Sequence, residues 1–353
     1  MALFMLLLVQ SAFHPIKVIQ LAGAEHITEL KGQKLDYWID RTAQNSIEHQ
    51  AKSSFGFRPA LVRFMNQLRL TLLDEHNSNV LFGEDGYYFE EGYRFSVCGL
   101  DFIGEEAIDA KVDSLDHFRN QLLLEGKKLV ILIAPNKWRT HRNKIDWECK
   151  PKMTNYEMIV DKLKHRGYSI CDEIDLFRYE RSQRPPHPLH SKQGTCWSIF
   201  GAALSADHLW MTFAQEGVNL PEFTIENEEI DSVPRNIDKD LHDLLNIMAS
   251  PKKERLAYPE FKFNQAYKPR VTVIGDSYYQ SYYYLGLHQG LFSMDSKYFY
   301  YNKSYYGENL EQKEALTDEI RRQEIEASDA VLLVMSEPSL KWLGYGIFNL
   351  YAN

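Results

Sequence analysis

The sequence has few cysteines, and they show no metal-binding spacing. Only four occur in 353 residues, Cys98, Cys149, Cys171 and Cys196, and no two of them form a CxxC pair. This spacing predicts no metal site, and we also expect no cofactor. An even number permits disulfides, but a chain of this size does not need them, so the cysteines leave the redox compartment open.

The sequence also lacks a basic run, an internal repeat and a low-complexity tract. It has 40 Lys and Arg against 49 Asp and Glu, which gives a formal net charge of -9. A nucleic-acid-binding surface needs clustered positive charge, so we expect no nucleic-acid partner. The hydrophobic fraction of 44% is ordinary for a soluble globular protein with a sizeable core.

No apolar run reaches the roughly 20 residues of a transmembrane helix. The N-terminal run, residues 1–13, instead fits the hydrophobic part of a signal peptide or membrane anchor, although no positive charge precedes it. A buried first helix is the alternative. We expect three parts: an export or anchor segment over residues 1–24, a helical segment over 25–75, and an α/β domain over 76–353.

The helical segment shows a clear apolar stripe. Apolar residues recur at spacings of three and four from Leu61 to Leu72, and Pro59 suits the first turn of a helix. Beyond it, Val80–Phe82 and Tyr87–Phe89 flank a turn bounded by glycines, which predicts a hairpin. We expect the α/β domain to begin there.

Strand and helix patterns then alternate along the chain. Lys128–Ala134, Val271–Ile274 and Ala330–Met335 are apolar enough to be strands buried on both faces. The alternation predicts a mostly parallel sheet with helices on both faces, in which the first two of these strands are neighbours. Residues 218–253 are acidic and predict an irregular insertion or exposed face.

The stretch Arg270–Tyr279 contains the candidate nucleophile. Gly275 ends the apolar strand, and Asp276 and Ser277 are residue types that form turns or cap helices. A serine between a strand and a helix presents its hydroxyl outward, near backbone N–H groups that can stabilise an oxyanion. Ser277 is therefore the candidate nucleophile and Gly275 a candidate part of the oxyanion hole. The alternative is that Asp276 and Ser277 only cap a helix.

Several stretches together resemble one protein family. Gly275-Asp276-Ser277 resembles the first block of the SGNH hydrolases, and Gly194–Ala202 resembles the Thr-His-Trp-Ser segment of their AlgX/AlgJ-like branch, the alginate O-acetyltransferase relatives. Further matches keep the order of that family: Ser54–Arg58, Asn66–Leu68, Leu81–Phe89, Ile133–Lys137 and Leu332–Glu337. The resemblance covers most of the chain after residue 50.

The resemblance implies an SGNH-hydrolase-like, flavodoxin-like α/β fold in a periplasmic protein or a membrane-anchored protein facing the periplasm. It implies acetyl transfer to or from an envelope or extracellular polysaccharide, with a membrane acyltransferase as a further partner. It also places the catalytic base at position 196 and, in many relatives, an aspartate at position 194. This chain has Cys196 and Gly194 instead.

A cysteine at position 196 leaves the base unassigned. A thiol with a pKa near ~8.5 is mostly neutral at neutral pH and does not replace imidazole as a general base. Three interpretations remain. In the first, His190 or His187 on the adjoining loop supplies the base. In the second, the protein is an inactive member of a polysaccharide-acetylating assembly and only binds the polysaccharide. In the third, Cys196 itself carries the acyl group. The alternative for both histidines is an exposed loop position.

Other side chains are weaker candidates. Asn136 follows a strand and is the candidate side-chain donor of the oxyanion hole, with Asn302 as a second choice; the alternative for each is a turn or cap residue. Asp175 and Asp207 are candidates for orienting the base, and the alternative for each is an ordinary surface charge. An intracellular esterase is a third function class, which a cleaved or membrane-retained N-terminus would argue against.

Overall fold

The computed structural model describes residues 10, 16, 18–23, 57–76, 78–150, 152–183, 185–265 and 267–351. Most of the expected export or anchor segment, residues 1–24, lies outside these ranges. Within them, no helix is both long and apolar enough to cross a membrane. The chain forms two compact units: Met1–Val80 with Leu241–Ser250, and Leu81–Asp240 with Pro251–Asn353.

The smaller unit contains helix α4 (Arg58–Leu73), which begins with a proline in its first turn. The amide of Asn66 donates to the carbonyl of Leu245 at 3.1 Å, and the side-chain oxygen of Gln67 accepts the N–H of Ala249 at 2.9 Å. These bonds join the helix to the second segment of its unit. The helix predicted from the apolar stripe is confirmed.

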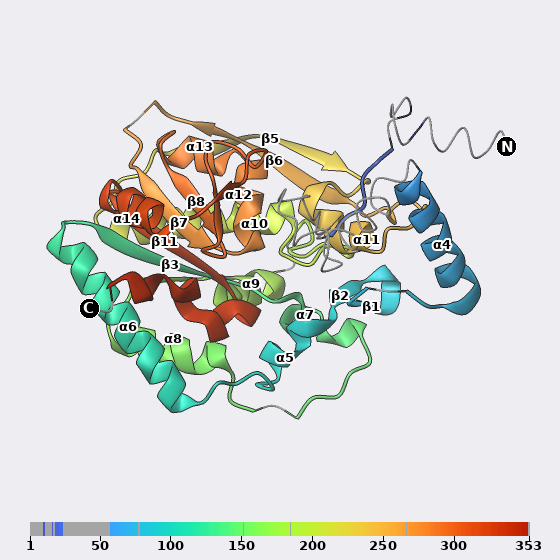
Figure 1. Cartoon of the computed structure of the whole chain (residues 1–353), viewed down its shortest axis with the longest axis horizontal. Helices are drawn as coiled ribbons and strands as arrows, with labels where there is room; N and C mark the ends of the chain where they lie inside the picture. The colour runs from blue at the N-terminus through green and yellow to red at the C-terminus, as the bar shows by residue number, and fades with distance from the viewer. Residues whose placement is uncertain are drawn as a thin grey trace, which may run out of the picture. The chain divides into compact units, whose positions relative to one another are not determined.

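The larger unit is built on a seven-stranded sheet (Figure 1). Its strands are β3 (Lys128–Ala134), β4 (Ile170–Asp172), β7 (Val271–Gly275), β8 (Lys297–Tyr300), β9 (Ser304–Tyr306), β10 (Glu314–Ala315) and β11 (Ala330–Ser336). Their order is β10-β9-β8-β7-β11-β3-β4; β8 to β4 are parallel, and β9 and β10 continue the sheet antiparallel. The mostly parallel sheet is confirmed. The prediction that β3 and β7 are neighbours is wrong, because β11 lies between them.

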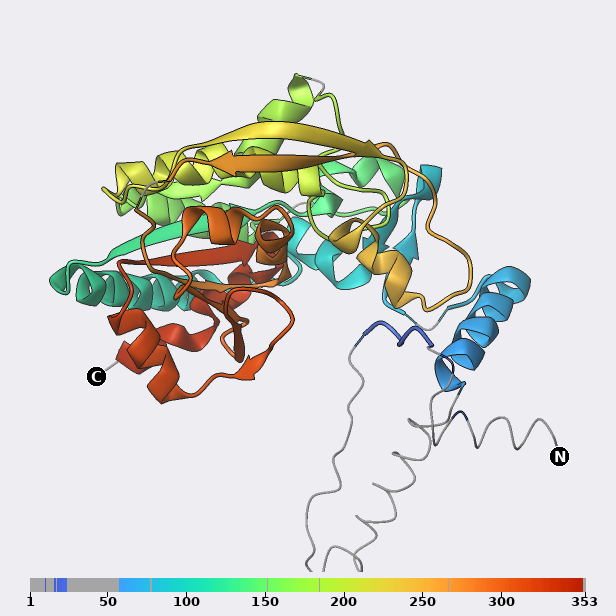
Figure 2. The same ribbon diagram turned by 90° about the horizontal axis from the view of Figure 1, so that it is seen from above.

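Helices cover both faces of this sheet (Figure 2). One core contains residues of α10 (Ile199–Gln215), α12 (Gln280–Tyr284) and α13 (Leu287–Leu291). The other contains residues of α6 (Glu105–Leu124), α8 (Asn155–His165), α14 (Asp318–Glu326) and η6 (Glu337–Tyr351). Successive residues of β3 enter opposite cores, Val130 and Leu132 one, Ile131 and Ile133 the other. This double burial explains its uninterrupted apolar run.

Two long strands outside the main sheet form an antiparallel ribbon. β5 (Phe223–Asp231) pairs with β6 (Leu256–Phe263) along its whole length, with one irregularity. The prediction of an irregular segment over residues 218–253 is therefore wrong for β5. Most side chains of β5 are exposed, whereas β6 packs on α10.

The remaining elements are short. The predicted hairpin is confirmed as β1 (Val80–Phe82) paired with β2 (Tyr88–Glu90). The short helices are α5 (Arg94–Val97), α7 (Lys137–Thr140), α9 (Glu173–Ser182), α11 (Asp240–Leu244) and η5 (Ser277–Tyr279). Helices α7 and η5 each follow a sheet strand directly, so they place polar side chains at its carboxyl edge.

Candidate active site

Ser277 lies where β7 ends and η5 begins. Asp276 caps this helix, because its Oδ1 accepts the N–H of Tyr278 at 3.2 Å. Ser277 is half-buried, whereas its two neighbours are buried. The turn therefore places the serine at the carboxyl edge of the parallel strands, where open α/β sheets bind ligands.

The second carboxylate oxygen of Asp276 joins this turn to the neighbouring strand. Oδ2 accepts the N–H of Ser336 at 2.8 Å and the hydroxyl of Tyr345 at 3.0 Å, and the backbone carbonyl of Asp276 accepts the hydroxyl of Tyr298 at 2.5 Å. Asp276 is 1% exposed, so these bonds replace the water that the carboxylate loses on burial. They hold Ser277 against the end of β11.

Gly275 leaves room for a close approach of strands. A Cβ atom at this position would lie 2.9 Å from Cβ of Val334 on β11. The carbonyl of Gly275 accepts the N–H of Tyr301 at 2.8 Å. A side chain at position 275 would therefore separate the strands that support the serine.

Cys196 is the side chain beside the Ser277 hydroxyl. Its Sγ lies 3.9 Å from Oγ, and the hydroxyl of Tyr301 also interacts with the serine. Cys196 is 1% exposed, and burial, followed by the nearby charges of Asp240 and Asp276, raises the pKa of its thiol. Burial likewise raises the pKa of the Tyr301 phenol. Neither neighbour is therefore a general base at neutral pH.

His190 packs away from the serine. Its Nδ1 lies 3.2 Å from Oγ1 of Thr140, and its ring meets Phe177 edge-on with 5.4 Å between centroids. The ring is fully buried, and burial lowers its pKa. In the described ranges no hydrogen bond joins His190 to Ser277 or Cys196. The sequence placed these three residues together, but the structure brings together only the last two.

His187 is engaged by the β5–β6 ribbon. Its Nε2 lies 2.5 Å from Oε1 of Glu228, and its ring packs on Phe200. Like His190, it is buried. The alternative prediction of exposed loop histidines is therefore wrong for both.

The backbone around position 194 is tightly enclosed. A Cβ atom on Gly194 would lie 2.3 Å from the carbonyl oxygen of Ile237. Nζ of the buried Lys137 donates to the carbonyl of Gly194 at 2.7 Å, and burial lowers the pKa of this lysine to about 7. The next N–H, that of Thr195, donates to Oδ1 of Asp240 at 2.7 Å. In this conformation the surrounding backbone therefore leaves no room for a side chain at position 194.

The following residues of the same segment serve packing. Nε1 of the buried Trp197 donates to Oγ of Ser281 at 2.8 Å. Ser198 caps α10 by accepting the N–H of Gly201 at 2.9 Å. A Cβ atom on Gly201 would lie 2.4 Å from the carbonyl oxygen of Leu189. These contacts fix the start of α10 against α12 and the preceding loop.

The two asparagine candidates are engaged by other groups. The amide of Asn136 donates to the carbonyl of Tyr93 at 2.8 Å and to Oγ of Ser96 at 3.0 Å, which occupies both of its N–H groups. Oδ1 of Asn302 accepts Nε–H of Arg321 at 2.8 Å. Both side chains therefore stabilise the loops that carry them.

A carboxylate that the sequence analysis missed lies beside position 196. Of the two candidates from sequence, Asp175 pairs with Arg178 at 2.5 Å, and Asp207 lines a separate pocket. No hydrogen bond joins either of them to Cys196 in the described ranges. Asp240, in contrast, contributes to the raised pKa of Cys196. Because Asp240 belongs to the segment expected to be irregular, no sequence signal distinguished it.

One group of side chains has the donor types of a metal site. Atoms of Cys171, Glu173 and His208 lie within 4.8 Å of one another. The Cys171 thiol donates to Oε1 of Glu173 at 2.7 Å, and Nδ1 of His208 lies 3.1 Å from the same oxygen; this contact raises the pKa of the imidazole. The other oxygen of Glu173 has no partner among the described residues. These contacts form a hydrogen-bonded network among the three side chains. The expected absence of a metal site stays a prediction.

Sequence comparison identifies the family. Residues 80–291 match the profile of the SGNH hydrolase-like domain of the acetyltransferase AlgX. The match covers more than half of the chain. The chain belongs to this AlgX family. The resemblance found from the motifs is thereby confirmed, and no curated protein sequence matches the chain.

Solved structures are similar to the chain in fold alone. The O-acetyltransferase domain of Pseudomonas putida AlgJ is 14% identical, with a TM-score of 0.48 over 77% of this chain and 99% of that one. Pseudomonas aeruginosa AlgX is 14% identical, with a TM-score of 0.47 over 77% and 66%. Bacillus cereus PatB1 is 12% identical, with a TM-score of 0.46 over 75% and 97%.

Removing the Asp276 carboxylate should destabilise the protein. Asp276→Ala leaves the Ser336 N–H and the Tyr345 hydroxyl without their acceptor, so we expect a loss of about 2–4 kcal/mol in the free energy of unfolding. Urea denaturation measures it, with Asp295→Ala on the surface as the control, where a change within about 0.5 kcal/mol is expected. Equal losses in the two variants would contradict this role.

The free thiols should resist alkylation in the native protein. Cys171 and Cys196 are buried, and burial raises the pKa of both. At about pH 8 we expect iodoacetamide to modify neither until guanidinium unfolds the chain, whereas Cys98 and Cys149, which form a disulfide, need reduction first. Peptide mass spectrometry measures the modification. Fast native alkylation of Cys196 would instead support the acyl-carrying interpretation.

Proposed function

We propose that the protein is an O-acetyltransferase or acetylesterase of an envelope or extracellular polysaccharide, with Ser277 as nucleophile and with activity reduced by Cys196. The observation that carries this proposal is the Ser277 hydroxyl at the carboxyl edge of the sheet, 3.9 Å from Sγ at the position where the family has histidine. Membership of the AlgX family supports the acetyl group and the polysaccharide.

In the proposed reaction, Oγ of Ser277 attacks the carbonyl carbon of an acetyl ester, the bond to the donor oxygen breaks, and the serine proton ends on the released donor alcohol. A polysaccharide hydroxyl, or water, then attacks the acetyl-serine and releases the serine. The Ser277 N–H forms no hydrogen bond with the described residues, so it supports a role as oxyanion donor. Gly275 is paired with strands on both sides, and the amide of Asn136 is engaged, so we give these two candidates lesser roles.

Removing the proton from the Ser277 hydroxyl is the difficult step of this reaction. No imidazole is hydrogen-bonded to Ser277 within the described ranges, and a positioned general base is typically worth about 10²–10⁴-fold. His190 would first have to leave its buried place between Thr140 and Phe177. We therefore expect slow turnover.

Asp240 is our candidate for the orienting carboxylate. Position 194 has no room for the aspartate of the relatives, whereas Asp240 bonds the N–H of Thr195 and acts on the Cys196 thiol. An imidazole at position 196 would therefore have Ser277 and Asp240 within its surroundings, as a triad requires.

A polysaccharide-binding member without turnover is the second candidate function. It is favoured by the same observation that weakens the first: in the described ranges, the partners of the Ser277 hydroxyl are a thiol and a phenol rather than an imidazole. In this alternative the chain still binds the polysaccharide within the acetylation assembly of the family, but it catalyses no reaction.

The location and partners follow from the same proposal. The disulfide between Cys98 and Cys149 supports an oxidising compartment such as the periplasm. We propose an export or anchor segment over residues 1–24, a helical segment over 25–75 and the catalytic domain over 76–353. The acetyl donor would be a membrane acyltransferase partner.

Restoring the histidine should restore activity. We expect Cys196→His to raise turnover of 4-nitrophenyl acetate by about 10²-fold or more, because the imidazole takes the serine proton. Adding Ser277→Ala should abolish the gain, and Cys196→Ser is the matched control without a base. Thermal unfolding checks that the larger side chain is tolerated at this buried position.

Two results would redirect the assignment. If Cys196→His has no effect and His190→Ala removes existing activity, His190 is the base. If all variants are inert but the protein binds polysaccharide, the binding role is correct.

Restoring the aspartate at position 194 should fail. We expect Gly194→Asp to lower the free energy of unfolding by about 1–3 kcal/mol, because its Cβ atom meets the Ile237 carbonyl. In the Cys196→His background it should not raise turnover, whereas Asp240→Asn should remove most of the gain. Urea denaturation and ester turnover measure the two effects. A rise in turnover with Gly194→Asp would show that Asp240 is not the orienting group.

A further inference from the structure

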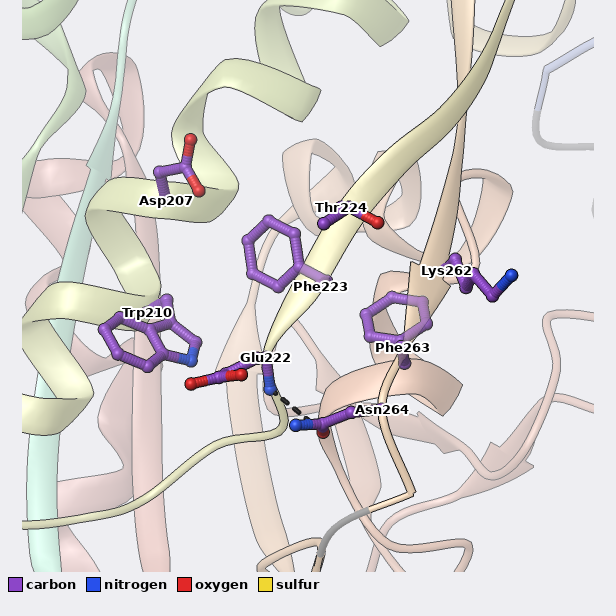
Figure 3. Close-up of a pocket in the computed structure, with 8 residues that line it drawn as sticks. All are labelled: Asp207, Trp210, Glu222, Phe223, Thr224, Lys262, Phe263 and Asn264. Carbon is purple, nitrogen blue, oxygen red and sulfur yellow. Dashed lines mark hydrogen bonds between the residues drawn. The ribbon is translucent and has the colours of Figure 1, made fainter.

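A pocket lies between α10 and the β5–β6 ribbon (Figure 3). Its cavity measures about 490 Å³, within the roughly 300–1,000 Å³ typical of small-ligand sites. Trp210 lines it from α10, and Phe223 and Phe263 line it from the position where β5 and β6 pair at their ends. Neither Ser277 nor Cys196 belongs to its lining. The pocket is therefore separate from the candidate active site.

The three aromatic rings are held in place by the protein. Nε1 of Trp210 donates to the carbonyl of Leu220 at 3.3 Å, and the rings of Phe223 and Phe263 lie 6.0 Å apart between centroids. A Cβ atom on Gly290 would lie 2.2 Å from the Phe263 ring, so the glycine makes room for it. Rings that are fixed before a ligand arrives lose little entropy on binding.

The polar groups of the pocket are mainly acceptors. Asp207 and Glu222 form no ion pair with other described residues, whereas Lys262 is neutralised by Glu226 at 3.0 Å. Oδ1 of Asn264 accepts the N–H of Glu222 at 3.2 Å, and its amide N–H groups make no bond in the described ranges. The pocket therefore offers carboxylate acceptors for hydroxyl groups, donors from Thr224, Lys262 and Asn264, and, since Lys262 is paired with Glu226, a net negative potential from Asp207 and Glu222.

We propose that this pocket binds neutral sugar residues of a polysaccharide. The C–H faces of a sugar pack on aromatic rings, and its hydroxyls donate to carboxylates, which matches both parts of the lining. Two carboxylates without a counter-ion repel a uronate, so the ligand is a neutral glycan rather than a polyuronate. This proposal rests on the proposed function, because the glycan is taken to be the polysaccharide whose acetyl esters react at Ser277.

Calorimetric titration of the full chain with chitopentaose, cellopentaose and a mannuronate pentamer tests the proposal. We expect at least one neutral pentamer to bind and the mannuronate not to bind. Trp210→Ala should weaken binding by about tenfold or more, whereas Met211→Ala, an exposed neighbour on α10 outside the pocket, should not change it. The double variant Asp207→Asn/Glu222→Gln keeps the pocket's shape and should admit the mannuronate.

These experiments distinguish a failure of the pocket proposal from a failure of the proposed catalytic function. Ser277→Ala should bind the neutral pentamer as the parent does, because Ser277 does not line the pocket. If Cys196→His gains no esterase activity while binding persists, the proposed catalytic function fails and the pocket stands. Absence of neutral-pentamer binding, equal binding by Trp210→Ala, or preference for the mannuronate would overturn the pocket proposal.

Discussion

The buried carboxylate of Asp276 is the interaction on which the candidate site depends. Its two oxygens accept hydrogen bonds from Tyr278, Ser336 and Tyr345, which belong to η5, the end of β11 and η6. Because a buried carboxylate without these donors would be costly, the three elements must meet at this point. The position of Ser277 follows from that meeting, since it is the next residue in the turn. Ser277, the proposed nucleophile, is therefore placed by a network that also serves stability.

Close backbone contacts set a second constraint. Gly275, Gly194 and Gly201 each lie where a Cβ atom would come within 3 Å of another segment. At position 194 this contact has a chemical consequence, because it excludes an aspartate side chain. A carboxylate reaches this segment from another part of the chain, because Asp240, the first residue of α11, accepts the N–H of Thr195. Packing thus limits which triads this backbone can support.

Local patterns predicted most of the elements and the mostly parallel sheet, but not the order of its strands. Lys128–Ala134 was found to the residue, because burial on both faces leaves an unbroken apolar run. β5 was missed because its exposed acidic side chains resemble a loop, and the order of β3 and β7 was wrong because the last strand inserts between them. The turn at Ser277 has a local signal. The inward packing of His190 and the approach of Asp240 have none, because both depend on how long loops fold.

The segment that carries the family resemblance is mostly a structural motif. Trp197 bonds Ser281, Ser198 caps α10, and Gly201 permits close packing, so these residues would be needed whether or not the protein is an enzyme. Of this segment, it is the side chain at position 196 that touches the Ser277 hydroxyl. A sequence match over the whole segment is therefore good evidence for the fold but poor evidence for catalytic activity. The identity of this one side chain decides whether a general base lies beside the Ser277 hydroxyl.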